Sequence, residues 1–180
     1  MKHKRYGFTI VELLIVIVII GILAAISIAT YNGMQKKVRN TARTQELVQW
    51  KKVFDVYKIQ NGELPSEVNN GSYMCLGSGF PSGLGGVARC RDINSASQGY
   101  TESDNASLMS KLITVSSLPG GDRKPVGALP TVGPYVYGQV YSIMLYTAID
   151  GSNLSDCPTP LSGVWTDGST TVICSITIPR

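Results

Sequence analysis

Glu12 is the residue whose position most needs a chemical explanation. It lies inside an apolar run, residues 8–29, that reads FTIVELLIVIVIIGILAAISIA. A carboxylate at the centre of a membrane helix costs roughly 2.5–3.5 kcal/mol on insertion scales, and less near the end of the helix. The run contains no Lys, Arg or His that could pair with Glu12 in the same segment. We therefore expect the partner of this carboxylate to lie on another chain.

The sequence offers few groups for catalysis. Its only histidine, His3, lies in a short basic N-terminal segment, so the rest of the chain has no Ser-His-Asp or Cys-His arrangement. No segment brings two carboxylates together at a spacing suggestive of acid–base chemistry. The glycine-rich segments lack the GxGxxG pattern of a dinucleotide loop. We expect neither enzymatic activity nor a cofactor.

One short segment carries oxygen ligands at a calcium-like spacing, from Asp150, Asn153 and Asp156. It departs from the EF-hand loop and lacks the final glutamate of that loop. An ordinary polar turn is the simpler interpretation. Zinc is also disfavoured, because the cysteines form no CxxC pair and would have to converge from wide spacings. We therefore expect no metal, with this segment as the calcium candidate.

The four cysteines are Cys75, Cys90, Cys157 and Cys174. An even number of cysteines behind an export signal favours disulfides, and four cysteines allow three pairings. We prefer Cys75–Cys90 and Cys157–Cys174, because each pair closes a short loop within one segment. Each bridge would stabilise the fold by roughly 2–4 kcal/mol.

The charge of the chain does not indicate a broad nucleic-acid surface. The 16 basic and 12 acidic residues give a formal net charge of +4, and three of the basic residues lie before the apolar run. Without those three, the chain is nearly neutral, which lets copies pack side by side with little repulsion. Four basic residues form a candidate patch: Arg89, Arg91, Arg123 and Lys124. With Tyr100 or Tyr135 nearby the patch could bind DNA, although solvated surface charge is the simpler interpretation.

Three interpretations of the N-terminal segment compete, and two of them are general. In a secretory signal peptide, basic residues at positions 2–5 would precede the apolar run, and residues 27–29, Ser-Ile-Ala, would offer a cleavage site. Glu12 argues against this interpretation. A plain signal anchor would explain the apolar run, whose 22 residues span about 33 Å as a helix. It would explain neither Glu12 nor the glycine at position 7.

The third interpretation rests on the segment GFTIVEL, residues 7–13, which follows the basic leader MKHKRY. This segment resembles the processing site of type IV prepilins and pseudopilins. In that family a membrane peptidase cuts after the glycine and methylates the new N-terminal amine. The resemblance implies cleavage between Gly7 and Phe8 and methylation of Phe8. It also implies that Glu12 pairs with the Phe8 amine of a neighbouring subunit during assembly.

The same resemblance implies partners and a location. The chain would form a helical homopolymer, cut by prepilin peptidase and assembled by a membrane platform with its ATPases. The precursor would lie in the inner or cytoplasmic membrane, and the product would be an extracellular filament for adhesion, twitching motility or DNA uptake. Two alternatives stay open: a pseudopilin of a type II secretion system, and a signal-anchored surface binding protein that never polymerises.

One long helix is expected to position these groups. Residues 30–60 contain no proline, and Gly33 is the only weak point. Apolar residues recur there at three- and four-residue spacing, as on the buried face of an amphipathic helix: Leu47, Trp50, Phe54 and Tyr57. Asn61 and Gly62 give a stop signal. The helix would run over residues 8–60 and span about 80 Å.

The rest of the chain is expected to form a small sheet. Residues 66–99 are rich in turn signals and predict loops. Residues 106–114 predict a short helix, residues 135–149 one or two strands, and residues 171–178 the last strand, after a hairpin turn at residues 166–169. The expected fold class is α+β, with a long N-terminal helix packed on a small antiparallel sheet, as in type IV pilins.

The predicted organisation has four segments. Residues 1–7 form the leader peptide, and residues 8–29 form the hydrophobic helix of the membrane and the filament core. Residues 30–61 continue that helix in amphipathic form. Residues 62–180 form the globular head, with a loop-rich insert and a C-terminal sheet.

Overall fold

The computed structural model describes residues 9–82, 88–92, 100–102, 105–121, 123–124, 126–127 and 131–180. The chain divides into two compact units, Met1–Val38 and Arg39–Arg180. The longest element, helix α1 (Ile10–Asn61), begins in the first unit and ends in the second.

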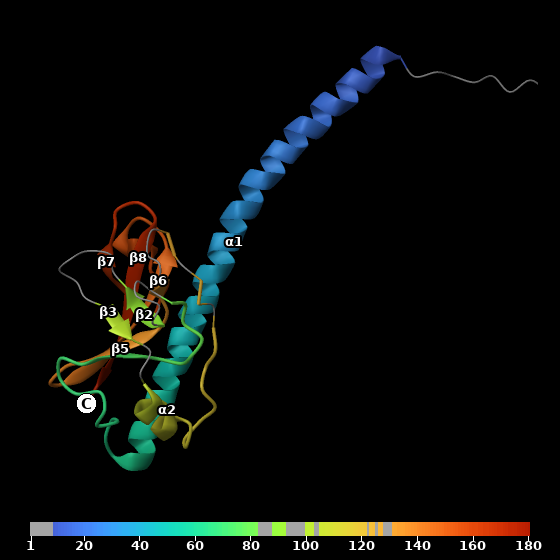
Figure 1. Cartoon of the computed structure of the whole chain (residues 1–180). Coiled ribbons are helices and arrows are strands. Elements are labelled where there is room, and N and C mark those ends of the chain that lie inside the picture. Colours follow the sequence, from blue (N-terminus) through green and yellow to red (C-terminus); the bar gives the residue numbers. More distant parts are fainter. Residues whose placement is uncertain are drawn as a thin grey trace, which may run out of the picture. The chain divides into compact units, whose positions relative to one another are not determined.

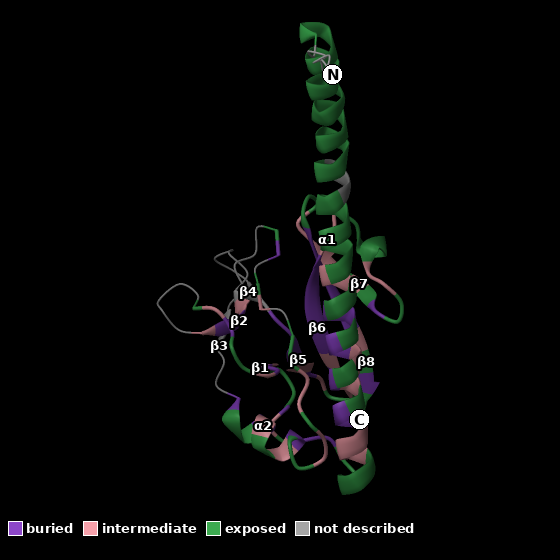
Figure 2. Cartoon of the chain, turned by 90° about the vertical axis from the view of Figure 1, so that its right-hand side faces the viewer, coloured by how far each residue is buried: buried purple, intermediate pink, exposed green. Residues whose placement is uncertain are grey.

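Helix α1 agrees with the prediction at its C-terminal end, whereas the predicted start at residue 8 lies outside the described residues. No proline interrupts its 52 residues, and the helix continues through Gly33. It stops where the sequence predicts, because Gly62 adopts φ +82° and its N–H donates to the carbonyl of Lys58 at 2.9 Å. A glycine with positive φ directly after the last turn is a common way to end a helix. Along α1 the first partly buried residue is Arg39 and the first buried one is Arg43. Figure 2 shows the exposed first part of the helix and the buried residues of its second part.

The main sheet of the second unit has five antiparallel strands in the order β1-β5-β6-β8-β7 (Figure 1). The strands are β1 (Tyr73–Cys75), β5 (Tyr135–Gly138), β6 (Ser142–Asp150), β7 (Ser162–Thr166) and β8 (Thr171–Pro179). Residues 135–149, predicted as one or two strands, form the two strands β5 and β6, and the predicted turn at 166–169 and last strand from Thr171 are confirmed.

Smaller elements occupy the segment predicted as loops and the region after it. A second sheet has the order β3-β2-β4, with β2 (Arg89–Asp92), β3 (Tyr100–Glu102) and β4 (Thr131–Val132). Strands β1 and β2 thus lie in the predicted loop region, where three or four residues give too little alternation to indicate a strand. The short helix is confirmed as α2 (Ala106–Leu112), and a 3-10 turn, η1, covers Leu154–Asp156.

The five-stranded sheet buries both of its faces. Along β6, Ile143, Leu145 and Ile149 belong to the cluster that contains the α1 stripe. The alternate residues Tyr146 and Ala148 belong to a second cluster that contains no α1 residue. This period of two is that of a strand. The predicted stripe on α1 is confirmed, since Leu47, Trp50 and Phe54 are fully buried and Tyr57 packs beside them.

Two disulfides staple the second unit. Cys75–Cys90 joins the two sheets, with a Cα–Cα distance of 5.5 Å. Cys157–Cys174 ties the segment after η1 to β8, with a Cα–Cα distance of 5.8 Å. These are the two pairs preferred from the sequence.

Candidate assembly site at the N-terminal helix

The first part of α1 presents an apolar surface that the chain itself does not cover. Its large side chains from Ile10 to Ile28 are between 49% and 86% exposed. Within the described residues, α1 is the one helix long and apolar enough to cross a membrane, and none of its most apolar stretch is buried. The core helix of a soluble protein would be mostly buried. This surface therefore requires lipid or other protein chains around it.

Glu12 lies in the first turn of this helix and closes a reciprocal hydrogen-bonded ring with Thr9. The N–H and the hydroxyl of Thr9 both donate to Oε2 of Glu12 at 2.8 Å. In return the N–H of Glu12 donates to Oγ1 of Thr9 at 3.2 Å. This is a capping box, which satisfies N–H groups that the first turn of a helix leaves without partners. The carboxylate also lies at the helix end where the backbone dipole favours negative charge.

The ring leaves part of the Glu12 carboxylate available. Both Thr9 donors reach Oε2, and no donor from the described residues reaches Oε1. A cationic amine could therefore approach the second oxygen without breaking the cap. Gly7 and Phe8, the predicted sites of cleavage and methylation, lie outside the described residues, so their roles remain predictions.

Thr9 is a site residue that the sequence interpretation missed. The signal was present, because Thr9-Ile10-Val11-Glu12 has the T-x-x-E spacing of a capping box before an apolar run. The interpretation treated Glu12 only as a carboxylate that needs a partner on another chain. The structure shows that Glu12 also caps the N-terminus of its own helix.

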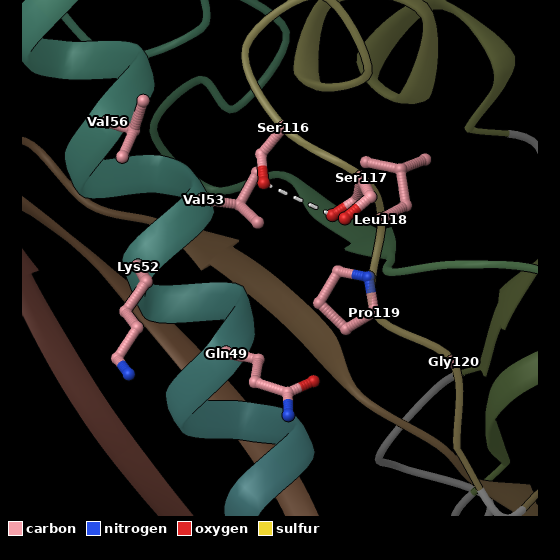
Figure 3. Close-up of a pocket in the computed structure, with 9 residues that line it drawn as sticks. All are labelled: Gln49, Lys52, Val53, Val56, Ser116, Ser117, Leu118, Pro119 and Gly120. Atoms are coloured by element: carbon pink, nitrogen blue, oxygen red, sulfur yellow. Dashed lines mark hydrogen bonds between the residues drawn. The ribbon is translucent and has the colours of Figure 1, made fainter.

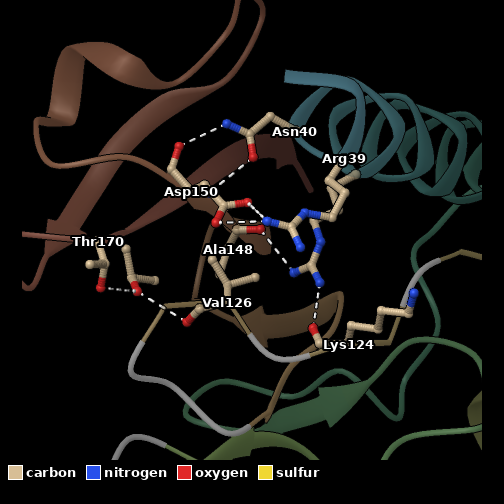
Figure 4. Close-up of polar contacts among 9 residues, drawn as sticks. Arg39, Asn40, Lys124, Val126, Ala148, Asp150 and Thr170 are labelled. Atoms are coloured by element: carbon tan, nitrogen blue, oxygen red, sulfur yellow. Dashed lines mark hydrogen bonds and ion pairs between the residues drawn. The ribbon is translucent and has the colours of Figure 1, made fainter. Parts of the chain in front are cut away.

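A second polar group joins α1 to the sheet where α1 enters the second unit (Figure 4). Arg39 pairs with the carboxylate of Asp150 at 3.1 Å. The amide of Asn40 donates to the carbonyl of Asp150 at 2.8 Å and accepts from its N–H at 2.9 Å. Buried Arg43 donates to the carbonyls of Ala148, at 3.1 Å, and of Lys124. We call Arg39, Asn40 and Arg43 the clasp.

Two residues of the calcium candidate bind partners within the protein: Asp150 binds the clasp, and Asp156 binds the backbone of its own turn. Asp150 faces Arg39. Asp156 accepts the N–H groups of Ser152 and Asn153 at 2.8 and 2.9 Å, and these backbone donors, Asn153 first, lower its pKa. The described part of the chain contains no group of three or more His, Cys, Asp or Glu side chains that could hold a metal. These contacts are those of a polar turn.

The four basic residues of the candidate DNA patch have separate environments. Arg123 pairs with Glu46 and lies over the ring of Phe80, and its side chain is 11% exposed. Arg89 is 8% exposed. The interpretation of both as solvated surface charge is therefore wrong. Arg91 lies against a group of tyrosines that includes Tyr135, while Lys124 is exposed.

A hollow of about 350 Å³ lies between α1 and the segment after α2 (Figure 3). Its wall on α1 includes Gln49 and Val53, and its other wall is residues 116–120. The only polar contact drawn between its lining residues is the hydrogen bond from Ser116 to the carbonyl of Ser117, at 3.3 Å. Its described lining residues include no His, Cys or acidic side chain, and Lys52 is the one ionisable side chain among them.

Comparison with known proteins adds to this geometry. Residues 2–28 match the family model of the prokaryotic N-terminal methylation motif. The type II secretion system core protein G of Aeromonas hydrophila is 32% identical over 65 residues, which are 36% of this chain and 46% of that protein. The protein of the same name from Escherichia coli K12 is 33% identical over 63 residues, 35% of this chain and 43% of that protein. The chain thus spans less than half the length of these relatives.

A different relative is matched over nearly its whole length. The type IV major fimbrial protein FimA of Dichelobacter nodosus is 31% identical over 156 residues, which are 87% of this chain and 93% of that protein. No solved structure is significantly similar to the chain. The match to FimA extends well beyond the N-terminal motif, and the motif contains Glu12 and its cap. The chain therefore belongs to the type IV pilin and pseudopilin family.

Proposed function

We propose that this chain is a structural subunit of a type IV pilus-like filament. One observation carries the proposal: the apolar first part of α1 is uncovered and begins with a single capped carboxylate, Glu12. Lipid would cover the helix before assembly, and the same helices of neighbouring subunits would cover it afterwards. Because lipid tails are as apolar as these side chains, the helices would associate in the membrane through van der Waals packing rather than through the hydrophobic effect. In the filament outside the membrane, the same packing would keep their apolar surface out of water.

Processing creates the partner that Glu12 lacks. Cleavage between Gly7 and Phe8 would remove the leader, residues 1–7, and leave a methylated amine on Phe8. That amine is a cation one residue before the capping Thr9. In a filament it would pair with Glu12 of a neighbouring subunit, so that only the correct axial register places both charges in contact. Residues 8–29 would then form the filament core, 30–61 the second part of the helix, and 62–180 the exposed head.

The partners follow from this sequence of events. Prepilin peptidase would cut and methylate the precursor in the cytoplasmic membrane. An assembly platform with its ATPases would then extract subunits into an extracellular filament. The near-complete match to FimA supports a pilin, whereas the shorter matches to type II secretion proteins keep a pseudopilin as the second candidate.

The first experiment is intact-mass and N-terminal analysis of the protein in filaments sheared from the cell surface. The proposal expects a chain that begins at N-methylated Phe8. A chain that begins at Met1, or at Thr30 in the medium, would contradict it.

Two variants then separate processing from assembly. Glu12→Ala should be cut normally but should sharply reduce the yield of sheared fibres, because the amine loses its counter-charge. Glu63→Ala removes an exposed carboxylate beyond the end of α1 and serves as the matched control. Normal fibre yield from Glu12→Ala would count against the pairing.

A further inference from the structure

A hollow of about 240 Å³ lies on the face of the five-stranded sheet that is turned away from α1. Four lining residues are aromatic and come from four strands: Tyr73, Tyr135, Tyr146 and Trp165. The others are Arg91, Val164 and Ile173. Pockets for drug-sized ligands measure about 300–1,000 Å³. The hollow therefore suits one ring of a ligand rather than a large molecule.

The aromatic residues form an ordered base. The rings of Tyr135 and Tyr146 are stacked, with centroids 4.9 Å apart and 12° between their planes. Both are nearly buried, at 3% and 9% exposure. Burial raises the pKa of Tyr146 to about 12, and its hydroxyl donates to Sδ of Met144 at 3.2 Å. The base thus provides a flat apolar surface.

Arg91 is held in place by a second stack. The Tyr73 ring stacks on Tyr137, with centroids 4.4 Å apart. The guanidinium carbon of Arg91 lies 4.2 Å from the centroid of the Tyr73 ring. A guanidinium held on an aromatic face loses little freedom when it binds a ligand, and its planar fork matches the two oxygens of a carboxylate.

A β-bulge completes the wall. Consecutive residues of a strand normally point to opposite faces, yet Val164 and Trp165 both line the hollow. The pairing of β7 with β8 shifts register between Gly163 and Trp165, which turns Trp165 toward Ile173 as its partner. Val164 is 45% exposed and Trp165 is partly exposed. The bulge therefore leaves an accessible aromatic surface beside a fixed guanidinium.

We propose that this hollow binds one acidic pyranose residue of a glycan. The apolar face of the sugar ring packs on Trp165, since C–H groups are attracted to the negative face of an aromatic ring. The sugar carboxylate pairs with Arg91, and the stacked rings of the base close the hollow from below. The hollow lies wholly within the Arg39–Arg180 unit, so this binding does not depend on filament assembly.

Two other ligand classes fit the hollow less well. Single-stranded nucleic acid needs a row of cations that follows its phosphates, and Arg91 is the only cation among the described residues that line the hollow. An organic cation would favour the aromatic faces, but it would meet the positive charge of Arg91. An acidic ring uses both the aromatic surface and that charge.

The test uses the full chain in detergent micelles and titration calorimetry with three probes. The probes are an oligosaccharide that ends in glucuronic acid, its counterpart that ends in glucose, and single-stranded oligothymidylate. We expect the acidic sugar to bind at least about tenfold more tightly than the neutral one, which is the factor that about 1.4 kcal/mol provides. Tryptophan fluorescence locates the site, because Trp50 is fully buried and only Trp165 lines the hollow.

Single substitutions test the separate contributions of Arg91 and Trp165 to sugar binding. Arg91→Gln should abolish the preference for the acidic sugar, and Arg91→Lys should retain only part of it because the flat fork is lost. Trp165→Ala should weaken the binding of both sugars at least about tenfold, by loss of the ring contact. Tyr141→Ala removes a tyrosine that is 84% exposed outside the hollow, and it should change nothing. Thermal melting checks that each variant is folded.

Several results would overturn the proposal. One is failure of the folded wild type to bind the acidic sugar at millimolar concentration. A second is a preference that survives Arg91→Gln. A third is binding of oligothymidylate that depends on Arg91 while neither sugar binds, which would assign the hollow to nucleic acid.

Discussion

Glu46 and Arg123 form an ion pair inside the second unit, with Oε1 of Glu46 2.7 Å from Nη1 of Arg123. Their side chains are 3% and 11% exposed. The pair joins α1 to the segment after α2, and Arg123 also donates to the carbonyl of Ser78 at 3.3 Å. One guanidinium therefore connects three stretches of chain that are far apart in the sequence.

Loss of either partner alone should be costly. Arg123→Met leaves the Glu46 carboxylate buried without its counter-charge, and removal of one partner of a buried pair typically destabilises by about 3–5 kcal/mol. Urea denaturation of the detergent-solubilised chain measures the change. The double variant Glu46→Gln with Arg123→Met should recover much of the loss, because both charges are gone. A loss below about 1 kcal/mol in Arg123→Met would show that solvent screens the pair.

Neighbouring glycines provide a sharper test of the same site. A Cβ built on Gly121 would lie 1.9 Å from Oε2 of Glu46, whereas one built on Gly120 meets nothing within 4 Å. Gly121→Ala should therefore push the Glu46 carboxylate away from Arg123 and lower the urea midpoint, by about the 1–3 kcal/mol of an overpacked site. Gly120→Ala should be close to neutral. Equal midpoints for the two variants would contradict the packing described around Glu46.

Thr9 should matter for assembly through its hydroxyl. Thr9→Val keeps the shape of the side chain but removes the group that binds Glu12 in both directions. Loss of an N-cap costs about 0.5–2 kcal/mol of helix stability, so the first turn should fray and fibre yield should fall. Thr9→Ser keeps the hydroxyl and should assemble like the wild type. The measurement is the mass of sheared fibres per cell, with processing checked by N-terminal analysis. Similar yields from Thr9→Val and Thr9→Ser would mean that the cap plays no part in assembly.

Asp167 should make the head less stable in acid. Burial opposes its ionisation, but the N–H groups of Thr171, Ser169 and Thr170 outweigh burial and hold the pKa of Asp167 below its ordinary value. A lowered pKa in the folded state stabilises the fold above the unfolded pKa, near 3.9, and this contribution is lost as the pH falls toward the folded pKa. Asp167→Asn should therefore be less stable than the wild type at pH 7, and the difference should shrink at pH 3. Urea midpoints at the two pH values measure it, and a difference that grows in acid would contradict the assignment.

The sequence predicted those parts of the fold that depend on local pattern. The α1 stripe, the stop at Gly62 and the strand pair around residues 135–150 each leave a periodic or turn signal over several residues. Strands β1 and β2 left none, because they are three and four residues long and are held by partners distant in the chain. Their existence depends on tertiary pairing, which outweighs local preference.

The functional residues were also predictable only where the signal lies within one stretch of the sequence. Glu12 was identified because a charge in an apolar run is unusual in the sequence itself. The sequence did not reveal that Arg123 would be buried, because its partner Glu46 lies 77 residues away. Nor did it reveal the hollow at Tyr73, Arg91 and Trp165, because each lies on a different strand and only the strand order brings them together.

The Asn40 amide bonds to both backbone groups of Asp150, as a neighbouring strand would. An apolar stripe alone fixes the position of a helix on a sheet only loosely. If the helix rotates or slides by one residue, it can exchange one apolar contact for another. A pair of directional bonds does not tolerate such an exchange, because a turn of one residue moves the amide by about 100° around the helix. Together with the bonds from Arg39 and Arg43, Asn40 therefore sets the rotation of the second part of α1 against β6.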